Sequence, residues 1–241
     1  MLRGIYTATS GMLTQQRVQE MTSNNMANLN TTGHKRDMSV QSDFPSMLIN
    51  RVNDTDSAGP GGPEIDMRPY IGELGTGTMI EETVKDFSQG SLKETDNALD
   101  LALEGEGFFT VEGIDGEEYY TRNGALTLAH GEETDEAFLS TLQGHPVMGQ
   151  EGVIQLSGDE EVSITESGAI YEGTGDDQEF VDNLALVNFE NAQGLSRQGE
   201  NLLEETEESG APIDLDLEED DAGELTVHQG MVETSNVNTV D

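Results

Sequence analysis

The sequence opens with the stretch MLRGIYTATSGMLTQQRVQEMTSNNMANLNTTGHKRD, residues 1–37. Apolar residues recur in it at approximately helical spacing, separated by Thr, Gln, Arg and Glu, which predicts one long amphipathic helix. Several asparagines between residues 24 and 30 weaken the helical pattern, because short amide side chains compete for backbone hydrogen bonds. Gly33 then supplies a residue that tolerates the left-handed conformation. The helix is therefore expected to end between residues 27 and 32.

An isolated amphipathic helix is only marginally stable in water, so its apolar stripe needs a partner. The sequence leaves two partners open: the chain's own domain, or another copy of the chain. The residues of the stripe are Leu2, Ile5, Tyr6, Met12, Leu13, Val18, Met21 and Leu29.

Composition favours a β-rich remainder. The 241 residues include 28 glycines, 5% aromatic residues and no tryptophan, which is typical of domains with many turns. Cysteine is absent, so disulfide and thiolate chemistry are excluded. The N-terminus lacks a continuous apolar segment and the chain lacks any run of about 18 apolar residues, so we expect neither a cleaved secretion signal nor membrane insertion.

The charge of the chain is large and unevenly distributed. Ten Lys and Arg oppose 49 Asp and Glu, giving a net charge of -39 that repels nucleic acid and anionic membranes. Residues 1–43, in contrast, are nearly neutral. A nearly neutral N-terminal segment suits a helix that is buried against other subunits, because buried unpaired charge is costly. We interpret the acidity of the remainder as adaptation to high salt, which screens self-repulsion.

Turn-forming residues divide the rest of the chain. Residues 34–71 are rich in Pro, Gly and Asp without regular apolar spacing, which indicates an extended arm with its tip at residues 53–63. From residue 72, short apolar segments alternate with glycines, the pattern of an all-β domain. Asn123-Gly124 predicts a type I′ hairpin, and Gly144-His145 predicts a second hairpin. Residues 184–189 have the apolar density of a fully buried strand.

Patterns typical of catalysis or metal binding are weak. With 49 acidic residues, a pair of carboxylates arises by chance, and the chain lacks a nucleophile elbow and a Walker lysine. Residues 214–224 resemble a calcium loop, but their glycine is the tenth residue instead of the sixth. The histidines lack the spacing of metal ligands and are expected in turns or on the surface. They are His34, His130, His145 and His228. The sequence therefore predicts no enzyme, no metal site and no cofactor.

Several motifs, in order along the chain, closely resemble those of bacterial flagellar rod and hook proteins. Near the N-terminus they are residues 5–12 (IYTATSGM), 24–28 (NNMAN) and 30–36 (NTTGHKR). Further along they are residues 87–95, 97–109, 120–125, 144–149, 186–191, 199–203 and 233–238. The resemblance covers nearly the whole chain, and the chain length resembles that of a rod protein, since hook proteins are longer.

The resemblance implies a structural subunit of the flagellar basal-body rod, polymerising through terminal helices to transmit torque for motility. The implied partners are other copies of the chain, other rod and hook proteins, and the flagellar export apparatus. Rod proteins leave through that apparatus without a cleaved signal peptide, so the implied location is the basal body. In related proteins the arm reaches along neighbouring subunits.

The predicted fold is mainly β, with a long N-terminal helix, an extended arm, an all-β domain and the beginning of a C-terminal helix. The predicted domains are residues 1–33 (assembly helix), 34–71 (arm), 72–232 (β domain) and 233–241 (start of the C-terminal helix). Ser235 and Asn236 offer an N-cap, and Val237 and Val240 begin an apolar spacing that adds to the assembly residues. Rod proteins continue here into a second amphipathic helix, so we interpret the chain as truncated or as lacking that helix.

One alternative remains open at the level of sequence. Residues 204–224 are far more acidic than the usual pattern of rod proteins. Together with the β content, this acidity also fits a secreted, calcium-dependent β adhesion or binding module.

Overall fold

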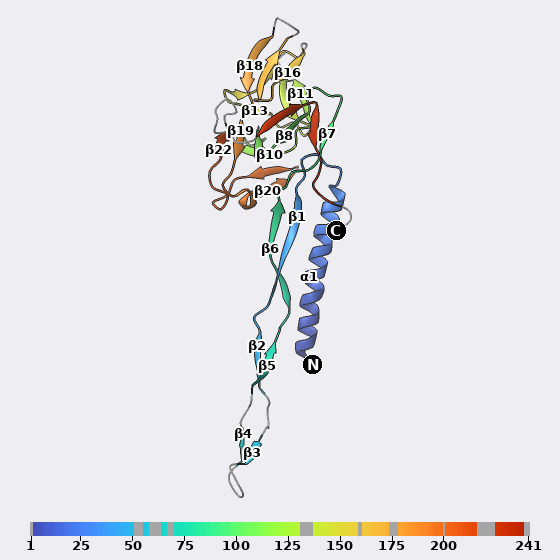
Figure 1. Cartoon of the computed structure of the whole chain (residues 1–241), viewed down its shortest axis with the longest axis vertical. Helices are drawn as coiled ribbons and strands as arrows, with labels where there is room; N and C mark the ends of the chain where they lie inside the picture. Colours follow the sequence, from blue (N-terminus) through green and yellow to red (C-terminus); the bar gives the residue numbers. More distant parts are fainter. Residues whose placement is uncertain are drawn as a thin grey trace. The chain divides into compact units, whose positions relative to one another are not determined.

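The structure is a computed structural model that describes residues 2–50, 55–57, 64–66, 70–130, 137–158, 161–173, 178–199, 201–215 and 225–238. Its contacts divide the chain into two units. The arm unit comprises Met1–Asn24 and Asp37–Val84, and the β unit comprises Asn25–Arg36 and Lys85–Asp241. Figure 1 shows the helix α1 at the N-terminus and strands through most of the remaining chain, which confirms the mainly β prediction.

Helix α1 spans Leu2–Ala27, which confirms the predicted helix and its end. Hydroxyl side chains inside the helix donate to carbonyls one turn earlier. Thr9 Oγ1 donates to Ile5 O at 2.8 Å, and Thr22 Oγ1 donates to Val18 O at 2.9 Å. These bonds satisfy the hydroxyls without breaking the helix. Beyond Ala27 the chain turns, and Gly33 adopts the expected left-handed conformation at φ +66°.

The arm is a ribbon of paired strands. Strand β1 (Arg36–Asp43) neighbours β6 (Thr78–Asp86), and β2 (Met47–Asn50) pairs antiparallel with β5 (Tyr70–Leu74). Strand β3 (Thr55–Ser57) pairs antiparallel with β4 (Glu64–Asp66). The domain boundary predicted between residues 71 and 72 falls inside β5, whereas the two units divide between Val84 and Lys85. Of the predicted arm tip, residues 53–63, all but residues 55–57 lie outside the described residues.

The β unit is built around a six-stranded sheet with the order β20-β21-β10-β9-β19-β22. Its strands are β9 (Phe108–Glu112), β10 (Glu118–Thr121), β19 (Leu186–Asn188), β20 (Ser196–Gly199), β21 (Leu202–Glu204) and β22 (Ile213–Leu215). Strands early in this unit pair with strands at the end of the chain. These antiparallel pairs are β7 (Leu92–Glu94) with β24 (Met231–Glu233), and β8 (Leu101–Glu104) with β23 (Thr226–Gln229).

Three smaller sheets complete the β unit. The first has the order β11-β12-β15, the second β16-β17-β18, and the third consists of β13 and β14. Their strands are β11 (Leu126–His130), β12 (Ala137–Thr141), β13 (Met148–Gly149), β14 (Gly152–Val153), β15 (Gln155–Leu156), β16 (Val162–Ile164), β17 (Ala169–Glu172) and β18 (Glu179–Asn183). A short 3-10 helix, η1, spans Ala192–Gly194.

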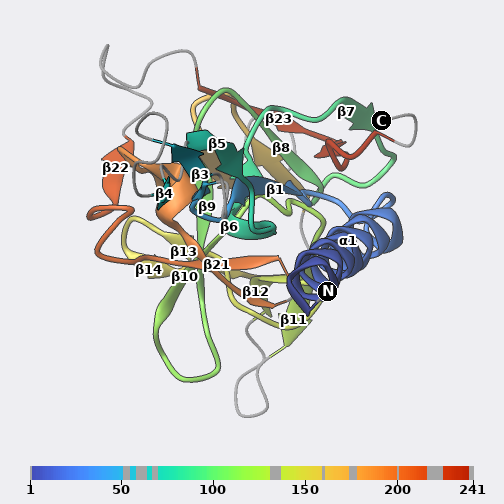
Figure 2. The ribbon, with the colours of Figure 1, turned by 90° about the horizontal axis from the view of Figure 1, so that it is seen from below.

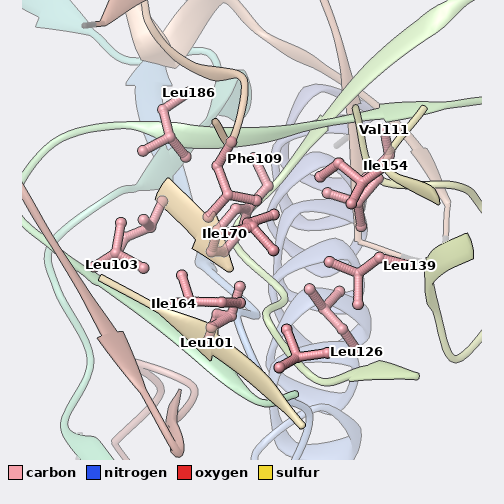
Figure 3. Packing of buried hydrophobic residues seen from close by; sticks show 14 of the residues in the cluster. Leu101, Leu103, Phe109, Val111, Leu126, Leu139, Ile154, Ile164, Ile170 and Leu186 are labelled. Carbon is pink, nitrogen blue, oxygen red and sulfur yellow. The ribbon is translucent and has the colours of Figure 1, made fainter. Parts of the chain in front are cut away.

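Two hydrophobic clusters cover opposite faces of the six-stranded sheet, because side chains alternate along a strand. Phe109 and Val111 point into a mainly aliphatic cluster with Leu101, Leu139 and Ile170, all almost completely buried. Figure 3 shows the labelled side chains of this cluster gathered from several sheets.

On the other face, Phe108 joins an aromatic cluster with Tyr120 and Phe189. The ring centroids of Tyr120 and Phe189 lie 4.9 Å apart in an edge-to-face arrangement, which suits the ring quadrupoles. The predicted buried strand at residues 184–189 is confirmed, since β19 contributes Leu186 to the first cluster and Val187 to the second.

The predicted hairpin at Asn123-Gly124 is wrong. Strands β10 and β11, which flank this dipeptide, belong to different sheets. Gly124 is needed for close approach instead, because a Cβ at this position would collide with the carbonyl oxygen of Leu101. That approach allows Leu101 N to donate to Gly124 O at 2.8 Å.

The second predicted hairpin is confirmed. Thr141 N donates to His145 O at 2.8 Å, and Gly144 has a φ of +93°. Ser140 and Pro146 continue the pairing as an antiparallel bridge.

The beginning of a C-terminal helix is not confirmed. Residues 234–238 form neither helix nor strand, and residues 239–241, including Val240, lie outside the described residues.

The aliphatic cluster provides a test of the core. Replacing Ile170 by Ala removes a side chain with no exposed surface and should lower the free energy of unfolding by about 2–5 kcal/mol through lost burial and a cavity. Leu142→Ala is the control, since Leu142 is 67% exposed and its loss should cost about 0.5 kcal/mol or less. Urea denaturation measures both; equal losses would contradict the assigned core.

Candidate assembly surface

Helix α1 contacts the arm through polar side chains. Thr7 Oγ1 donates to Thr76 O at 3.2 Å, and Thr14 Oγ1 donates to Thr78 O at 3.1 Å. Thr7 and Thr14 are two helical turns apart, so they lie on the same side of α1. Between Thr7 and Thr14, the helix therefore contacts the arm through hydrogen bonds of hydroxyl groups.

Gly77 allows this close approach. It has a φ of +141°, which disfavours residues with a Cβ, and an added Cβ would collide with the hydroxyl of Ser10. The same Cβ would lie 3.2 Å from the Phe44 ring. The glycine between two threonines thus lets α1 and the ribbon approach within hydrogen-bonding distance.

The opposite side of α1 is apolar and exposed. Ile5 is 60% exposed, Tyr6 71%, Met12 65% and Leu13 58%. Seven residues, or two turns, separate Ile5 from Met12 and Tyr6 from Leu13, so the four side chains lie on one side of the helix. We call these four residues the outward side of α1.

The other predicted assembly residues lie elsewhere. Val18 and Met21 are half-buried and follow Thr14 at helical spacing on the arm-facing side. Leu29 and Val237 are half-buried in the β unit, beyond the end of the helix. The side chain of Leu2, and Val240 as a whole, lie outside the described parts of the structure. The predicted single stripe is therefore divided between two sides of α1 and the β unit.

Sequence reasoning missed further exposed apolar residues. Met26 near the end of α1 is 64% exposed. On the ribbon, Leu48 in β2 and Tyr70 and Ile71 in β5 are each more than half exposed. The apolar run at residues 47–49 was the available signal, but the turn-rich composition around it obscured it.

A buried charge cluster lies where the segment after α1 enters the β unit. Lys35 Nζ and Glu233 Oε1 are 2.6 Å apart, and both side chains are almost fully buried. Arg122 Nε lies 3.9 Å from Glu233 Oε2, an ion pair too long for a hydrogen bond. Burial lowers the pKa of Lys35, although the Glu233 carboxylate opposes this shift. Burial likewise lowers the pKa of Arg122, against the opposing effect of Glu233.

Backbone groups complete the charge cluster. Lys35 Nζ donates to Ser88 O at 3.0 Å, and Gly90 N donates to Glu233 Oε1 at 2.7 Å. Arg122 Nη2 donates to Gly105 O at 2.5 Å. Two cations and one carboxylate are thus accommodated because carbonyl oxygens solvate the second cation.

Amide side chains surround the charge cluster. Asn236 Oδ1 accepts from Arg36 N at 2.8 Å, and its Nδ2 donates to Asp86 O at 2.7 Å. Asn201, at φ +62°, donates through Nδ2 to Thr32 O at 3.2 Å. Motif residues from the beginning, middle and end of the sequence therefore meet in one place.

The histidines do not form a metal site in the described residues. His34 and His145 are buried and each follows a turn, so for these two the expected turn placement holds and the expected surface placement does not. His34 Nδ1 lies 3.3 Å from Asn201 Oδ1 within the β unit. Over the described ranges, no three His, Asp or Glu side chains gather as potential metal ligands. Residues 216–224 of the proposed calcium loop lie outside those ranges. Within the described part of the chain, no helix combines the length and apolar character needed to cross a membrane.

The sequence matches two protein families. Residues 5–35 match the family described as "Flagella basal body rod protein". Residues 102–172 match the family described as "Flagellar hook protein FlgE/F/G D1 domain". The first match covers most of α1 and extends to Lys35, and the second covers strands from β8 to β17.

Individual flagellar proteins are similar over nearly the whole chain. The flagellar basal-body rod protein FlgG of Buchnera aphidicola subsp. Schizaphis graminum is 34% identical, over 100% of this chain and 88% of the relative. FlgG of Borreliella burgdorferi is 33% identical, over 98% of this chain and 85% of the relative. The flagellar hook-basal body complex protein FlhO of Bacillus subtilis is 48% identical over 43% of this chain and 36% of the relative. The adhesion-module alternative has no support among these relatives, which are flagellar proteins.

The charge cluster generates a test of stability. Lys35→Met leaves the buried Glu233 carboxylate without its closest cation and should lower the free energy of unfolding by about 3–5 kcal/mol. The matched control is Arg36→Gln, because Arg36 pairs with Asp86 at 3.0 Å with both side chains about a quarter exposed. Its cost should be about 1 kcal/mol or less. Urea denaturation at fixed salt measures both; equal small losses would contradict a structural role for the cluster.

Proposed function

The chain belongs to the family of flagellar basal-body rod proteins, structural subunits of the flagellum, and from that premise we propose that it polymerises through the outward side of α1. In this proposal, successive copies stack along an axis, and the helices of neighbouring subunits pack in a coiled-coil-like inner layer. Contacts between two different surfaces of identical subunits do not close on themselves, so they extend into a filament. The resulting tube transmits torque for motility.

One observation carries the proposal: the outward side of α1 is apolar, whereas its contacts with the arm are made by hydroxyl groups. The hydrogen bonds of Thr7 and Thr14 use the arm-facing side. Ile5, Met12 and Leu13 remain more than half exposed. A helix that served only its own chain would place these residues inward and the threonines outward.

The free energy of burying apolar side chains also supports packing of α1 against the helix of a neighbouring subunit. Complete burial of a side chain such as Ile5, Met12 or Leu13 contributes about 1.5–3 kcal/mol. Part of that gain is offset by the loss of translational and rotational freedom on association. A neighbouring helix of the same kind offers a matching apolar side, so burial between subunits would stabilise the assembly.

The basal-body location of the family leads to the remaining parts of the proposal. The partners are other copies of this chain and other rod and hook proteins, and the chain reaches them through the flagellar export apparatus without a cleaved signal peptide. Support for this route comes from family membership.

The acidity of the chain points to assembly in high salt. At a net charge of -39, self-repulsion disfavours both the compact fold and contacts between copies. Strands β9 and β10 even place Glu112 directly opposite Glu118, a like-charge pair that is unfavourable at low ionic strength. High salt would screen both effects.

Charge on the outward side should abolish assembly without unfolding the chain. The triple variant Ile5→Asp, Met12→Asp, Leu13→Asp should keep the circular dichroism of the β unit and fail to support swimming in a host lacking its own copy of this subunit. The reason is that each aspartate would have to be desolvated between subunits.

The matched control adds the same three charges at exposed positions on another side of α1, again seven residues apart: Ala8→Asp, Gln15→Asp and Thr22→Asp. This variant should retain swimming. Loss of the β signal in the first variant, or equal loss of swimming in both, would contradict the proposed surface.

Salt dependence gives a separate test. The melting temperature should rise between about 0.1 M and about 1 M NaCl, because the screening length falls from about 10 Å to about 3 Å. The double variant Glu112→Gln, Glu118→Gln should melt higher than the parent at low salt and close to it at high salt. A melting temperature independent of salt would refute the high-salt interpretation.

A further inference from the structure

A groove lies on the aromatic face of the six-stranded sheet in the β unit. Its volume is about 530 Å³, within the range of sites that hold ligands or peptide segments. Figures 1 and 2 show β10, β13 and β22, which contribute to it, near one another in the β unit. The residues lining it are Thr110, Glu118, Tyr120, Met148, Gly149, Gln150, Glu151, Gly152, Ala185, Leu186, Val187, Pro212, Asp214 and Leu215.

The floor of the groove is largely apolar, and one of its walls is held by backbone hydrogen bonds. Tyr120 and Val187, both buried, form part of the floor. The wall is the β13–β14 hairpin, whose Gln150 N donates to Asn183 O at 2.9 Å. The hairpin also accepts a hydrogen bond, since Ala185 N donates to Met148 O at 3.0 Å. The groove is therefore formed by strands whose positions are set by hydrogen bonds.

One residue that lines this groove carries a buried hydroxyl without a hydrogen-bond partner among the described residues. Thr110 is only 4% exposed and lines the groove, and its Oγ1 has no hydrogen-bond partner among the described residues. Thr110 N, in contrast, donates to Ala185 O at 3.2 Å. Burying a hydroxyl without a hydrogen bond is costly, so its position indicates a polar group supplied from outside the chain.

The charge of the groove is negative. Glu118, Glu151 and Asp214 line it, and among the described residues that line it none is basic. Burial, followed by the nearby carboxylates of Glu205, Glu118 and Asp214, raises the pKa of the Tyr120 hydroxyl to about 12. The negative potential of the groove therefore favours a ligand that carries positive charge.

We propose that the groove docks an extended segment of a partner polypeptide that presents a lysine or arginine between apolar residues. The apolar floor takes the flanking side chains, and the carboxylates at the rim take the cation. The Thr110 hydroxyl bonds to the backbone of the segment. A bare metal ion fits less well, because it would leave the apolar floor unused and the described residues hold no cluster of metal ligands. All lining residues belong to the β unit, so this site is tested independently of α1.

The test is a titration of the 15N-labelled full chain with three capped peptides, followed by amide chemical shifts. The probes are acetyl-Leu-Lys-Leu-amide, its Leu-Gln-Leu counterpart and its Leu-Glu-Leu counterpart. At low ionic strength the lysine peptide should shift the amides of Thr110, Glu151, Val187 and Asp214. It should bind about tenfold more tightly than the glutamine peptide, since charge complementarity distinguishes them. The glutamate peptide should bind more weakly still.

Two variants distinguish the contribution of the carboxylates to peptide affinity from that of the Thr110 hydroxyl. Glu151→Gln with Asp214→Asn, both at exposed positions, should weaken the lysine peptide about tenfold and leave the glutamine peptide unchanged. Thr110→Val removes only the hydroxyl and should weaken both peptides about threefold or more without lowering the melting temperature.

Three outcomes would overturn the proposal. They are equal affinity for the three peptides, shifts confined to amides outside the groove, and a Thr110→Val chain that binds all three peptides as the parent does. A titration with magnesium chloride alone provides a further control. Should magnesium move the same amides and the lysine peptide fail to displace it, the groove would be a cation site and the docking proposal would be wrong.

Discussion

The buried ion pair between Lys35 and Glu233 is the interaction on which the rest of the structure depends. It joins residues 198 positions apart, Lys35 in the segment between α1 and β1 and Glu233 at the end of β24. Because breaking a buried pair leaves an uncompensated charge, neither segment can leave the β unit without a large loss of stability. Arg122 lies in the same cluster, and β24 pairs with β7, so the beginning, middle and end of the sequence are held together. The segment that follows α1, residues 28–36, is thereby held at a defined point of the β unit.

Helix α1 reverses the usual arrangement of an amphipathic helix. Its intramolecular contacts are hydroxyl bonds to the ribbon, made possible by the absence of a side chain at Gly77. Each such bond contributes only about 0.5–1.5 kcal/mol. The side chains on the apolar outward side are each more than half exposed, so in the assembly we propose their burial would be the larger source of binding free energy. This arrangement fits a rod subunit in which α1 is held weakly by its own chain and its apolar side becomes buried only on assembly.

The distribution of positive charge explains why the remaining surface is so acidic. Lys35 and Arg122 are buried with Glu233, and Arg36 pairs with Asp86. Lys85 Nζ donates to Leu195 O at 2.5 Å, and Arg197 Nη2 donates to Lys35 O at 3.1 Å. Half of the ten basic residues are thus used around one junction of the β unit. The acidic groove beside Thr110 lies on a sheet with few cations to neutralise it, so a basic partner is the complementary ligand.

Local patterns in the sequence were sufficient for the extent of α1, the mainly β character, the turn at Gly144 and the buried strand at residues 184–189, because each depends on neighbouring residues alone. The motifs also identified the family. Only the tertiary structure decided that Asn123-Gly124 joins two different sheets, since the close approach of Leu101 to Gly124 comes from a distant strand. It also decided which side of α1 faces the ribbon, because hydroxyl bonds to the ribbon and a glycine more than sixty residues away outweigh apolar spacing. The charge cluster could not be predicted from the sequence either. A single charged residue carries no sequence signal that identifies its partner, and the two are brought together only when the chain folds and buries them.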